Sequence, residues 1–280
     1  MEIPVDLYLD VAKTAMERIQ ETLLSEGYTM YLDGYTSYFF NDNFYNVAEQ
    51  MDKAHNMHFV LGTAYEMDSW MDVDATLAKA VDAKKHASDH VKTNWVKLFM
   101  DGTVESGTGF VDRYPDGHEG TAIWTEEEFT DITRKANEQG LTVHTHAMGD
   151  KGVTRTVNAY VNGGKDELRN TLVHVRNVDA PDYKRMADHN IQVTSGMLWH
   201  CMSHEGVESL RQVIPADILD KPYPMKSFFD NGVNASLHSD YPALGGSPDD
   251  PFGIMEIAVT GVCSKTGGDP MWTEELVTCE

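Results

Sequence analysis

The sequence predicts an α/β fold in which parallel strands alternate with helices. Two observations lead to this prediction. Amphipathic helical segments recur along the 280 residues, and the short apolar runs between them end in polar or ionisable residues. Because each helix must return the chain to the same edge of a sheet, repeated strand–helix units make the strands parallel. An open doubly wound sheet and a closed barrel both satisfy this pattern.

Helical spacing and short apolar runs account for the elements of the first half. Apolar residues recur every four positions from Leu7 to Leu23, which predicts a helix, and Gly27 marks its end. Each later helical segment is also followed by an apolar run of strand length. The predicted elements are, in order, helix 7–25, strand 28–32, helix 43–55, strand 58–64, helix 74–91 and strand 95–100.

Capping residues mark the helices of the second half. Thr125, with Glu128 three residues later, forms a capping box, and Gly140 ends that helix. Asp179 with Pro181 begins another helix as an N-cap followed by an early proline. The elements are, in order, helix 125–139, strand 141–146, helix 150–160, strand 171–175, helix 179–189, strand 191–195, helix 224–230 and strand 234–237, which makes seven strands in all.

The charge balance disfavours two classes of partner. The chain has 45 acidic and 22 basic side chains, for a formal net charge of −23. Nucleic-acid binding needs a basic patch that neutralises phosphates, and anionic membranes attract basic segments, so neither partner is expected. No stretch approaches the roughly 20 apolar residues of a membrane span. This charge balance is compatible with a small-molecule substrate as the partner.

The cysteines indicate the default compartment. Cys201, Cys263 and Cys279 show neither a CxxC pair nor zinc-ribbon spacing. Structural disulfides are therefore not expected, and the reducing cytoplasm is the default location. Residues 1–6 contain no signal peptide, although the departures described below lead us to expect that the natural N-terminus is missing.

Ionisable residues lie at the ends of four predicted strands. They are Lys97, His146, His174 and Asp240, and His144 shares its strand face with His146. In a parallel barrel the carboxyl ends of the strands converge on one site. Nitrogen and carboxylate ligands suit divalent metals, with zinc as the default, and an aspartate beside the metal can deprotonate water. The pattern therefore predicts a site for one or two divalent ions.

Each of these residues, taken alone, has a simpler interpretation. A single histidine at a strand end is commonly a hydrogen-bonded structural residue. Lys97 by itself could be a surface lysine whose stem covers apolar groups, and Asp240 could begin a turn before Tyr241 and Pro242. Their joint occurrence, in this order on successive strands, favours the interpretation as ligands.

Four segments carry a family resemblance that covers residues from about 7 to about 262. Val96 to Gly102 resembles a VK-hydrophobic-x-x-DG pattern, His146 to Asp150 resembles HAIGD, Leu172 to Val175 resembles IEHA, and His238 to Pro242 resembles GSD-x-P. In this order they are similar to the YtcJ-like branch (amidohydrolase family 3) of the amidohydrolase superfamily. The resemblance implies a (β/α)8 TIM barrel of the metal-dependent hydrolase type.

The resemblance also implies a role for each residue. Lys97, carboxylated to a carbamate, would bridge two metals, and His146 and His174 would each bind one metal. Asp240 would bind metal and act as general base and acid. His144 is a candidate for an outer contact to a ligand. His200 would contact the substrate or the developing oxyanion, with a structural role as its alternative.

The sequence departs from the family pattern at several positions. The family's first barrel strand carries a His-x-His pair, and its chain ends form a small β-sandwich; neither has a counterpart here. We therefore expect an incomplete barrel, 1–280, that lacks strand one, and its unpaired sheet edges leave a homo-oligomer open. Met197 and Leu198 stand where the family often has Gln-Pro, Glu105 where small residues are common, and His238 where it has a glycine.

The predicted function is metal-dependent hydrolysis of carbon–nitrogen bonds in amide, N-acyl or N-formyl compounds by a metal-activated water. The alternative is a catalytically incompetent fragment or binding subunit that needs the first strand in trans. A third option, an open sheet that binds a nucleotide, is disfavoured because neither a G-x-G-x-x-G after an early strand nor a P-loop occurs in the sequence.

Overall fold

The computed structural model describes residues 5–36, 41–200, 204–241, 251–263 and 269–278. It divides into two compact units, the first formed by residues 1–98 with 138–142 and the second by residues 99–137 with 143–280. Each unit is described by itself, and the interpretation of 1–280 as one barrel domain stays a prediction.

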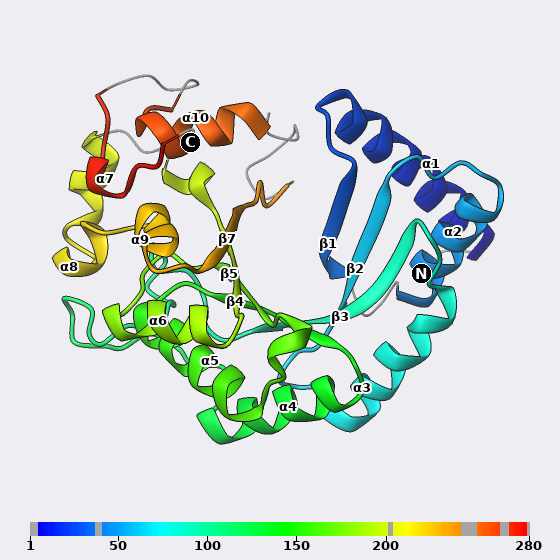
Figure 1. Cartoon of the computed structure of the whole chain (residues 1–280), viewed down its shortest axis with the longest axis horizontal. Helices are drawn as coiled ribbons and strands as arrows, with labels where there is room; N and C mark the ends of the chain where they lie inside the picture. Colours follow the sequence, from blue (N-terminus) through cyan, green and yellow to red (C-terminus); the bar gives the residue numbers. More distant parts are fainter. Residues whose placement is uncertain (1–4, 37–40, 201–203, 242–250, 264–268, 279–280) are drawn as a thin grey trace. The chain divides into compact units, whose positions relative to one another are not determined.

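The first unit contains three parallel strands with helices between them (Figure 1). Strand β1 pairs with β2, and β2 pairs with β3, in the order of the chain. Both pairings contain a register shift, between Asp33 and Thr36 and between Gly62 and Ala64. The elements are α1 (Val5–Ser25), β1 (Met30–Thr36), α2 (Asn41–Lys53), β2 (Val60–Glu66), α3 (Val73–Asp82), the 3₁₀ helix η1 (Ala83–His86) and β3 (Val91–Phe99).

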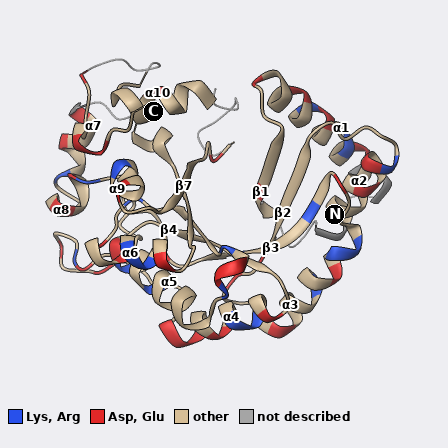
Figure 2. Cartoon of the chain, viewed as in Figure 1, with Lys and Arg blue, Asp and Glu red and all other residues tan. Residues whose placement is uncertain are grey.

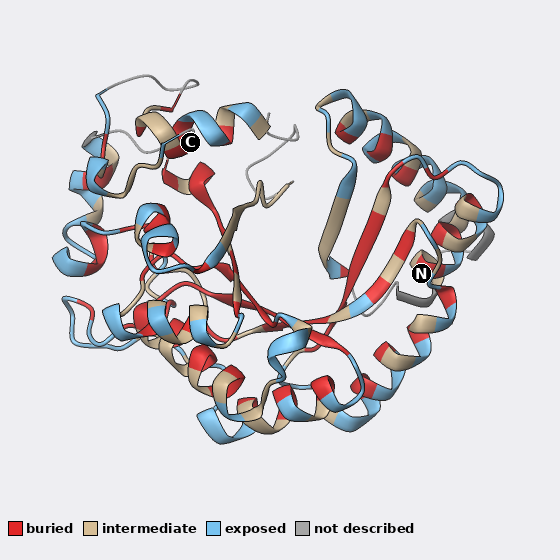
Figure 3. Cartoon of the chain, in the orientation of Figure 1, coloured by how far each residue is buried: buried red, intermediate tan, exposed pale blue. Residues whose placement is uncertain are grey.

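The core of the first unit lies between its helices and its strands. Met16 and Leu23 of α1 and Met51 of α2 pack with Leu61 of β2 and Val91 of β3. Figure 3 shows β2 almost wholly buried, as expected of a parallel strand that is covered on both faces. The amphipathic pattern of the first helices therefore encodes the face that they turn toward the sheet.

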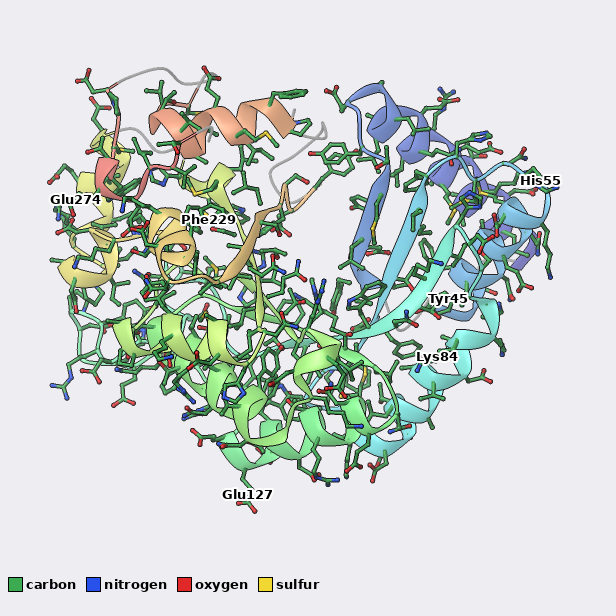
Figure 4. All side chains as sticks on the ribbon, viewed as in Figure 1. Tyr45, His55, Lys84, Glu127, Phe229 and Glu274 are labelled. Atoms are coloured by element: carbon green, nitrogen blue, oxygen red, sulfur yellow. The ribbon has the colours of Figure 1, made fainter. Side chains whose placement is uncertain are left out.

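An aromatic stack attaches η1 to α2. Tyr45, labelled in Figure 4, stacks on His86 with ring centroids 5.8 Å apart and on Tyr65 at 6.5 Å. His86 Nδ1 lies 2.7 Å from a carboxylate oxygen of Glu49, also on α2. The exposed charges lie mainly on the helices, as Figure 2 shows, and the strands carry few of them.

The second unit contains four parallel strands, which also pair in chain order from β4 to β7. Its elements are α4 (Glu126–Glu138), β4 (Thr142–Ala147), α5 (Asp150–Gly163), η2 (Asp166–Leu168), β5 (Thr171–His174), α6 (Ala180–Asp188), β6 (Gln192–Ser195), η3 (Met197–His200), α7 (His204–Leu210), α8 (Ala216–Leu219), α9 (Met225–Asp230), β7 (Asn234–Leu237), α10 (Pro251–Thr260) and η4 (Thr273–Glu275).

Local hydrogen bonds explain two features of the second unit. The capping box before α4 is confirmed, because Thr125 N donates to Glu128 Oε2 at 3.0 Å and Glu128 N donates to Thr125 Oγ1 at 3.2 Å. The buried Tyr160 hydroxyl on α5 lies 2.6 Å from Thr145 Oγ1 of β4 and 3.1 Å from the Thr171 carbonyl of β5. This hydroxyl therefore anchors α5 to two neighbouring strands.

All seven predicted strands are confirmed, with ends shifted by a few residues, but the predicted helix 74–91 is too long. Helix α3 ends at Asp82, and β3 already begins at Val91. Val91 N donates to Ser88 Oγ at 3.0 Å, and Leu61 N donates to the His90 carbonyl at 2.8 Å. Strand pairing and this turn therefore outweigh the helical spacing of the sequence.

The expectation of no disulfide is wrong. Cys263 is disulfide-bonded, and both of the other cysteines, Cys201 and Cys279, lie outside the described residues. Spacing along the sequence could not reveal this bond, because a disulfide depends on the distance between two cysteines in the folded chain. Among the described residues, no helix has the length and apolar character needed to cross a membrane.

Candidate metal centre

The carboxyl end of β5 places His174 in an unusual backbone conformation. His174 and Val175 have φ values of 74° and 47°, in the left-handed region that L-residues rarely adopt. Val175 N donates to the Ala147 carbonyl at 3.0 Å, which ties the turn to the end of β4. Such strain costs of order 1–3 kcal/mol per residue and is typical of functional sites. The His174 side chain is buried.

The carboxyl end of β7 brings two further polar side chains, His238 and Asp240, close to His174. His238 N donates to the Ser195 carbonyl at 3.1 Å and so extends the pairing of β7 with β6. Asp240 has a φ of 52°. His174, His238 and Asp240 each offer a ligand atom, and these atoms all lie within 4.8 Å of one another.

This group fits a divalent metal by its donor chemistry. Two imidazoles and a carboxylate are ligand types of catalytic zinc, which keeps a further position for water or substrate. The structure thus brings together two of the predicted ligands, His174 and Asp240. It adds His238, which the sequence analysis noted only as a departure from a glycine. The spacing of His238 and Asp240, two residues apart after a strand, was the available signal.

His146, the remaining predicted histidine ligand, lies beside His174. Their ring centroids are 4.5 Å apart at 65°. His146 Nε2 donates to the Gly102 carbonyl at 3.0 Å. Metal-ligating histidines commonly donate their other ring nitrogen to such an acceptor, so a metal contact from His146 would use Nδ1. His144 is also buried on β4, and its predicted outer contact stays a prediction.

Asp101 is a site residue that the sequence analysis did not single out. Its buried carboxylate accepts backbone hydrogen bonds from Met148 at 2.9 Å, Gly149 at 2.8 Å and Phe110 at 3.0 Å. Burial raises the pKa of Asp101 to about 7, against the lowering effect of these three donors. Asp101 therefore holds the loop that follows His146.

Lys97 belongs to the first unit, whereas the histidines and Asp240 belong to the second. It is buried on β3, where it is the register partner of Glu66 on β2. Its carbonyl accepts a hydrogen bond from Met67 N at 2.9 Å. Burial agrees with a special role, because a lysine in an apolar strand is costly unless paired or modified. Its role as a bridging ligand stays a prediction.

His200 lies in η3 and is 2 % exposed. Its Nε2 donates to the Met271 carbonyl at 3.1 Å, and its ring meets the edge of Trp272 at 4.5 Å between centroids. Burial lowers the pKa of His200, so the neutral form is favoured. These contacts link η3 to the segment before η4, and the predicted contact with substrate stays a prediction.

A buried ion pair involves Arg176, which lies two residues after His174 on the chain. Arg176, 1 % exposed, donates from Nε to Glu105 Oε1 at 2.7 Å. The Arg176 carbonyl accepts a hydrogen bond from Tyr223 N at 2.7 Å. The buried Tyr223 hydroxyl has no hydrogen-bond partner among the described residues. Burial first, then the charges of Glu105 and, more weakly, Asp240, raise the pKa of Tyr223.

Comparison with known proteins identifies a family and a relative of this chain. A family model described as the amidohydrolase family matches residues 7–274. An N-substituted formamide deformylase of Arthrobacter pascens is 26% identical over 200 residues, which are 66% of this chain and 34% of that protein. The chain thus spans about a third of the length of this curated relative.

Solved structures share the fold. An uncharacterized metal-dependent hydrolase from Pyrococcus furiosus superposes with a TM-score of 0.70 at 17% identity, over 92% of this chain and 50% of that one. An adenosine deaminase from Xanthomonas campestris with bound zinc gives a TM-score of 0.55 at 15% identity, over 92% of this chain and 51% of that one. These similarities confirm the predicted fold class, the α/β fold of metal-dependent hydrolases built as (β/α)8 barrels.

Proposed function

Since the chain belongs to the amidohydrolase family, we propose that it is a metal-dependent hydrolase of carbon–nitrogen bonds in amide, N-acyl or N-formyl compounds. One observation carries the proposal: ligand atoms of His174 and Asp240 converge at the carboxyl ends of parallel strands. The similarity to a formamide deformylase supports the class of bond. The order of the four motifs supports the YtcJ-like branch.

The roles of the residues follow from their chemistry. A bound divalent ion, with zinc as the default, would polarise the carbonyl group of the substrate and make water acidic enough to attack at neutral pH. His146, His174 and Asp240 would hold the ion, and a carbamate on Lys97 would supply a further oxygen ligand. Asp240 accepts a proton from the attacking water and returns it to the leaving nitrogen. A C–O bond forms at the carbonyl carbon and the C–N bond breaks.

The substitution Asp240→Asn tests this mechanism. The amide cannot accept the proton, so turnover of N-formyl and N-acyl amines should fall at least about 100-fold, the usual contribution of a general base. Asp188→Asn is the matched control, because Asp188 is an exposed partner of Lys184 on α6. Retained turnover in the Asp240 variant would exclude the proposed role.

The alternative function predicted from the sequence, a binding subunit without activity of its own, has a distinct outcome. Elemental analysis of the purified chain would then find bound metal, while none of the N-formyl or N-acyl amines would be hydrolysed. The double variant Lys97→Ala with His146→Ala should lower the metal content in either case. Metal content unchanged in this variant would remove both residues from the proposed ligand set.

A further inference from the structure

We propose that His238 is a metal ligand, so that His174, His238 and Asp240 form a three-ligand site from the ends of β5 and β7. This inference deepens the proposed function and rests on its metal dependence. It departs from the motif resemblance, in which a glycine stands at the position of His238 and contributes no side chain. The site lies wholly within the second unit.

The backbone places the His238 ring over the end of the neighbouring strand. Gly196 directly follows β6, and a Cβ atom added there would lie 3.1 Å from His238 Nε2 and 3.3 Å from its Cε1. Those distances are tighter than ordinary van der Waals contact. The absence of a side chain at Gly196 therefore provides the space in which the imidazole lies, close to His174.

The geometry brings the donors near a common point. The rings of His174 and His238 have centroids 4.8 Å apart and planes at 75°, so they meet edge to face rather than stacked. Donor atoms about 2.1 Å from a tetrahedral ion lie about 3.4 Å apart. Since the three ligand atoms already lie within 4.8 Å of one another, small side-chain rotations would complete the coordination.

Backbone strain and burial support a site rather than a chance cluster. Two of the three residues, His174 and Asp240, have positive φ, a conformation that costs free energy and persists where the surrounding structure enforces it. His174 is buried, whereas His238 and Asp240 are half-buried. One side of the group is therefore embedded in the sheet, and the other can admit water and a small substrate.

His200, a buried histidine of the same unit, has different surroundings. Its Nε2 donates to a backbone carbonyl, and it is absent from the one group of convergent ligand atoms found among the described residues. The ligand types also indicate the metal. Imidazole favours zinc and cobalt, whereas magnesium prefers oxygen ligands and water. We therefore expect the site to bind Zn²⁺ and Co²⁺ and to discriminate against Mg²⁺.

The test measures metal binding directly. The metal-stripped chain, His238→Gln and His238→Cys are titrated with Zn²⁺, Co²⁺ and Mg²⁺ by calorimetry, and the visible spectrum of the cobalt forms is recorded. We expect His238→Gln to raise the Kd for Zn²⁺ about 100-fold or more and to change the cobalt spectrum. Cysteine supplies a thiolate ligand, so His238→Cys should recover tight binding.

Two further variants separate ligation from folding. Gly196→Ala retains every ligand but adds a Cβ atom 3.1 Å from His238 Nε2 and 3.0 Å from Trp199 Cδ1. Because both rings must shift, the substitution should also weaken zinc binding. His189→Gln removes a half-exposed histidine beside Asp166 and should bind zinc like the native chain. Circular dichroism of each variant checks that the fold is intact.

The outcomes distinguish the two proposals. If the native chain binds zinc and His238→Gln binds it with equal affinity and an unchanged cobalt spectrum, the assignment of His238 is overturned while the proposed function stands. If the native chain binds neither zinc nor cobalt, both proposals are overturned. Weakened binding in His238→Gln and Gly196→Ala, with recovery in His238→Cys, supports the three-ligand site.

Discussion

Two polar clusters begin two residues apart at the end of β5, with His174 and Arg176, and they differ in the groups that they bring together. At the first, His174 converges with His238 and Asp240 on a common point. At the second, Arg176 is fully buried and forms an ion pair with Glu105 at 2.7 Å. The Arg176 guanidinium also donates to the Asn177 side chain and the Ile218 carbonyl, each at 2.8 Å.

The first cluster contains the candidate metal ligands, whereas the second joins segments of the fold. In the first cluster His174 is buried, His238 and Asp240 are half-buried, and the backbone of His174 and Asp240 is strained, which is typical of functional sites. The arginine cluster uses its donors to join the loop that carries Glu105 to helix α8. We therefore expect substitutions in the first cluster to change metal binding and substitutions in the second to change stability.

Breaking the arginine cluster should have the largest effect on stability. Glu105→Ala leaves the Arg176 charge buried without its carboxylate, which typically costs about 3–5 kcal/mol. Urea denaturation would measure the loss in the free energy of unfolding. Glu208→Ala is the matched control, because its ion pair with Arg211 is exposed and contributes about 0–1 kcal/mol. Equal effects of the two substitutions would contradict the supporting role of the arginine cluster.

His200 should make the stability of the folded chain depend on pH. Burial lowers its pKa in the folded state, so the unfolded chain binds a proton first as the pH falls below about 6.5. The contribution of neutral His200 to stability is therefore complete above that pH and is lost below it, by at most about 1.4 kcal/mol per pH unit. Thermal unfolding of His200→Gln between pH 7 and pH 5 should show a shallower decline.

The experiment on His200→Gln requires a control substitution at another histidine. His189→Gln is the control for the loss of a histidine side chain, because His189 lies near the surface of the same unit beside Asp166. If His200→Gln declined with pH as steeply as the native chain, the group responsible would lie elsewhere.

The smallest effect is expected for the buried hydroxyl of Tyr223, whose backbone N–H donates to the Arg176 carbonyl. Tyr223→Phe removes a buried hydroxyl that has no hydrogen-bond partner among the described residues. Stability should stay unchanged or rise by up to about 1 kcal/mol, because an unsatisfied buried polar group is unfavourable. Denaturation measurements would reveal a hidden partner if the variant lost more than about 1 kcal/mol.

The fold was largely predictable because the spacing of apolar residues and the capping of helices depend on residues that are close in the sequence. Apolar spacing located all seven strands, and the capping box at Thr125 and Glu128 has the predicted hydrogen bonds. The helix predicted over 74–91 was too long because strand pairing at Val91 depends on β2, which is distant in sequence. The short helices α7 and α8 and the helix α10 lacked a clear amphipathic pattern and were not predicted.

The site was predictable only in part. His174 and Asp240 were identified because each follows a strand, and parallel strands end at one edge. His238 was not predicted to join His174 and Asp240, because only the folded chain shows its ring in the space beside Gly196. Asp101 was missed as an anchor because two of its three backbone donors, Met148 and Gly149, are remote in the sequence.

By itself, the sequence determined the alternation of helices and parallel strands, the order of the ionisable residues at strand ends and the family to which they point. These properties depend on the spacing of apolar side chains along the chain and on the residues that stand at the strand ends. The tertiary structure decided which donor atoms converge, which carboxylate supports a loop and which cysteine forms a disulfide. Those outcomes depend on distances of a few ångströms between segments remote in sequence, and such distances are set only when the chain is packed.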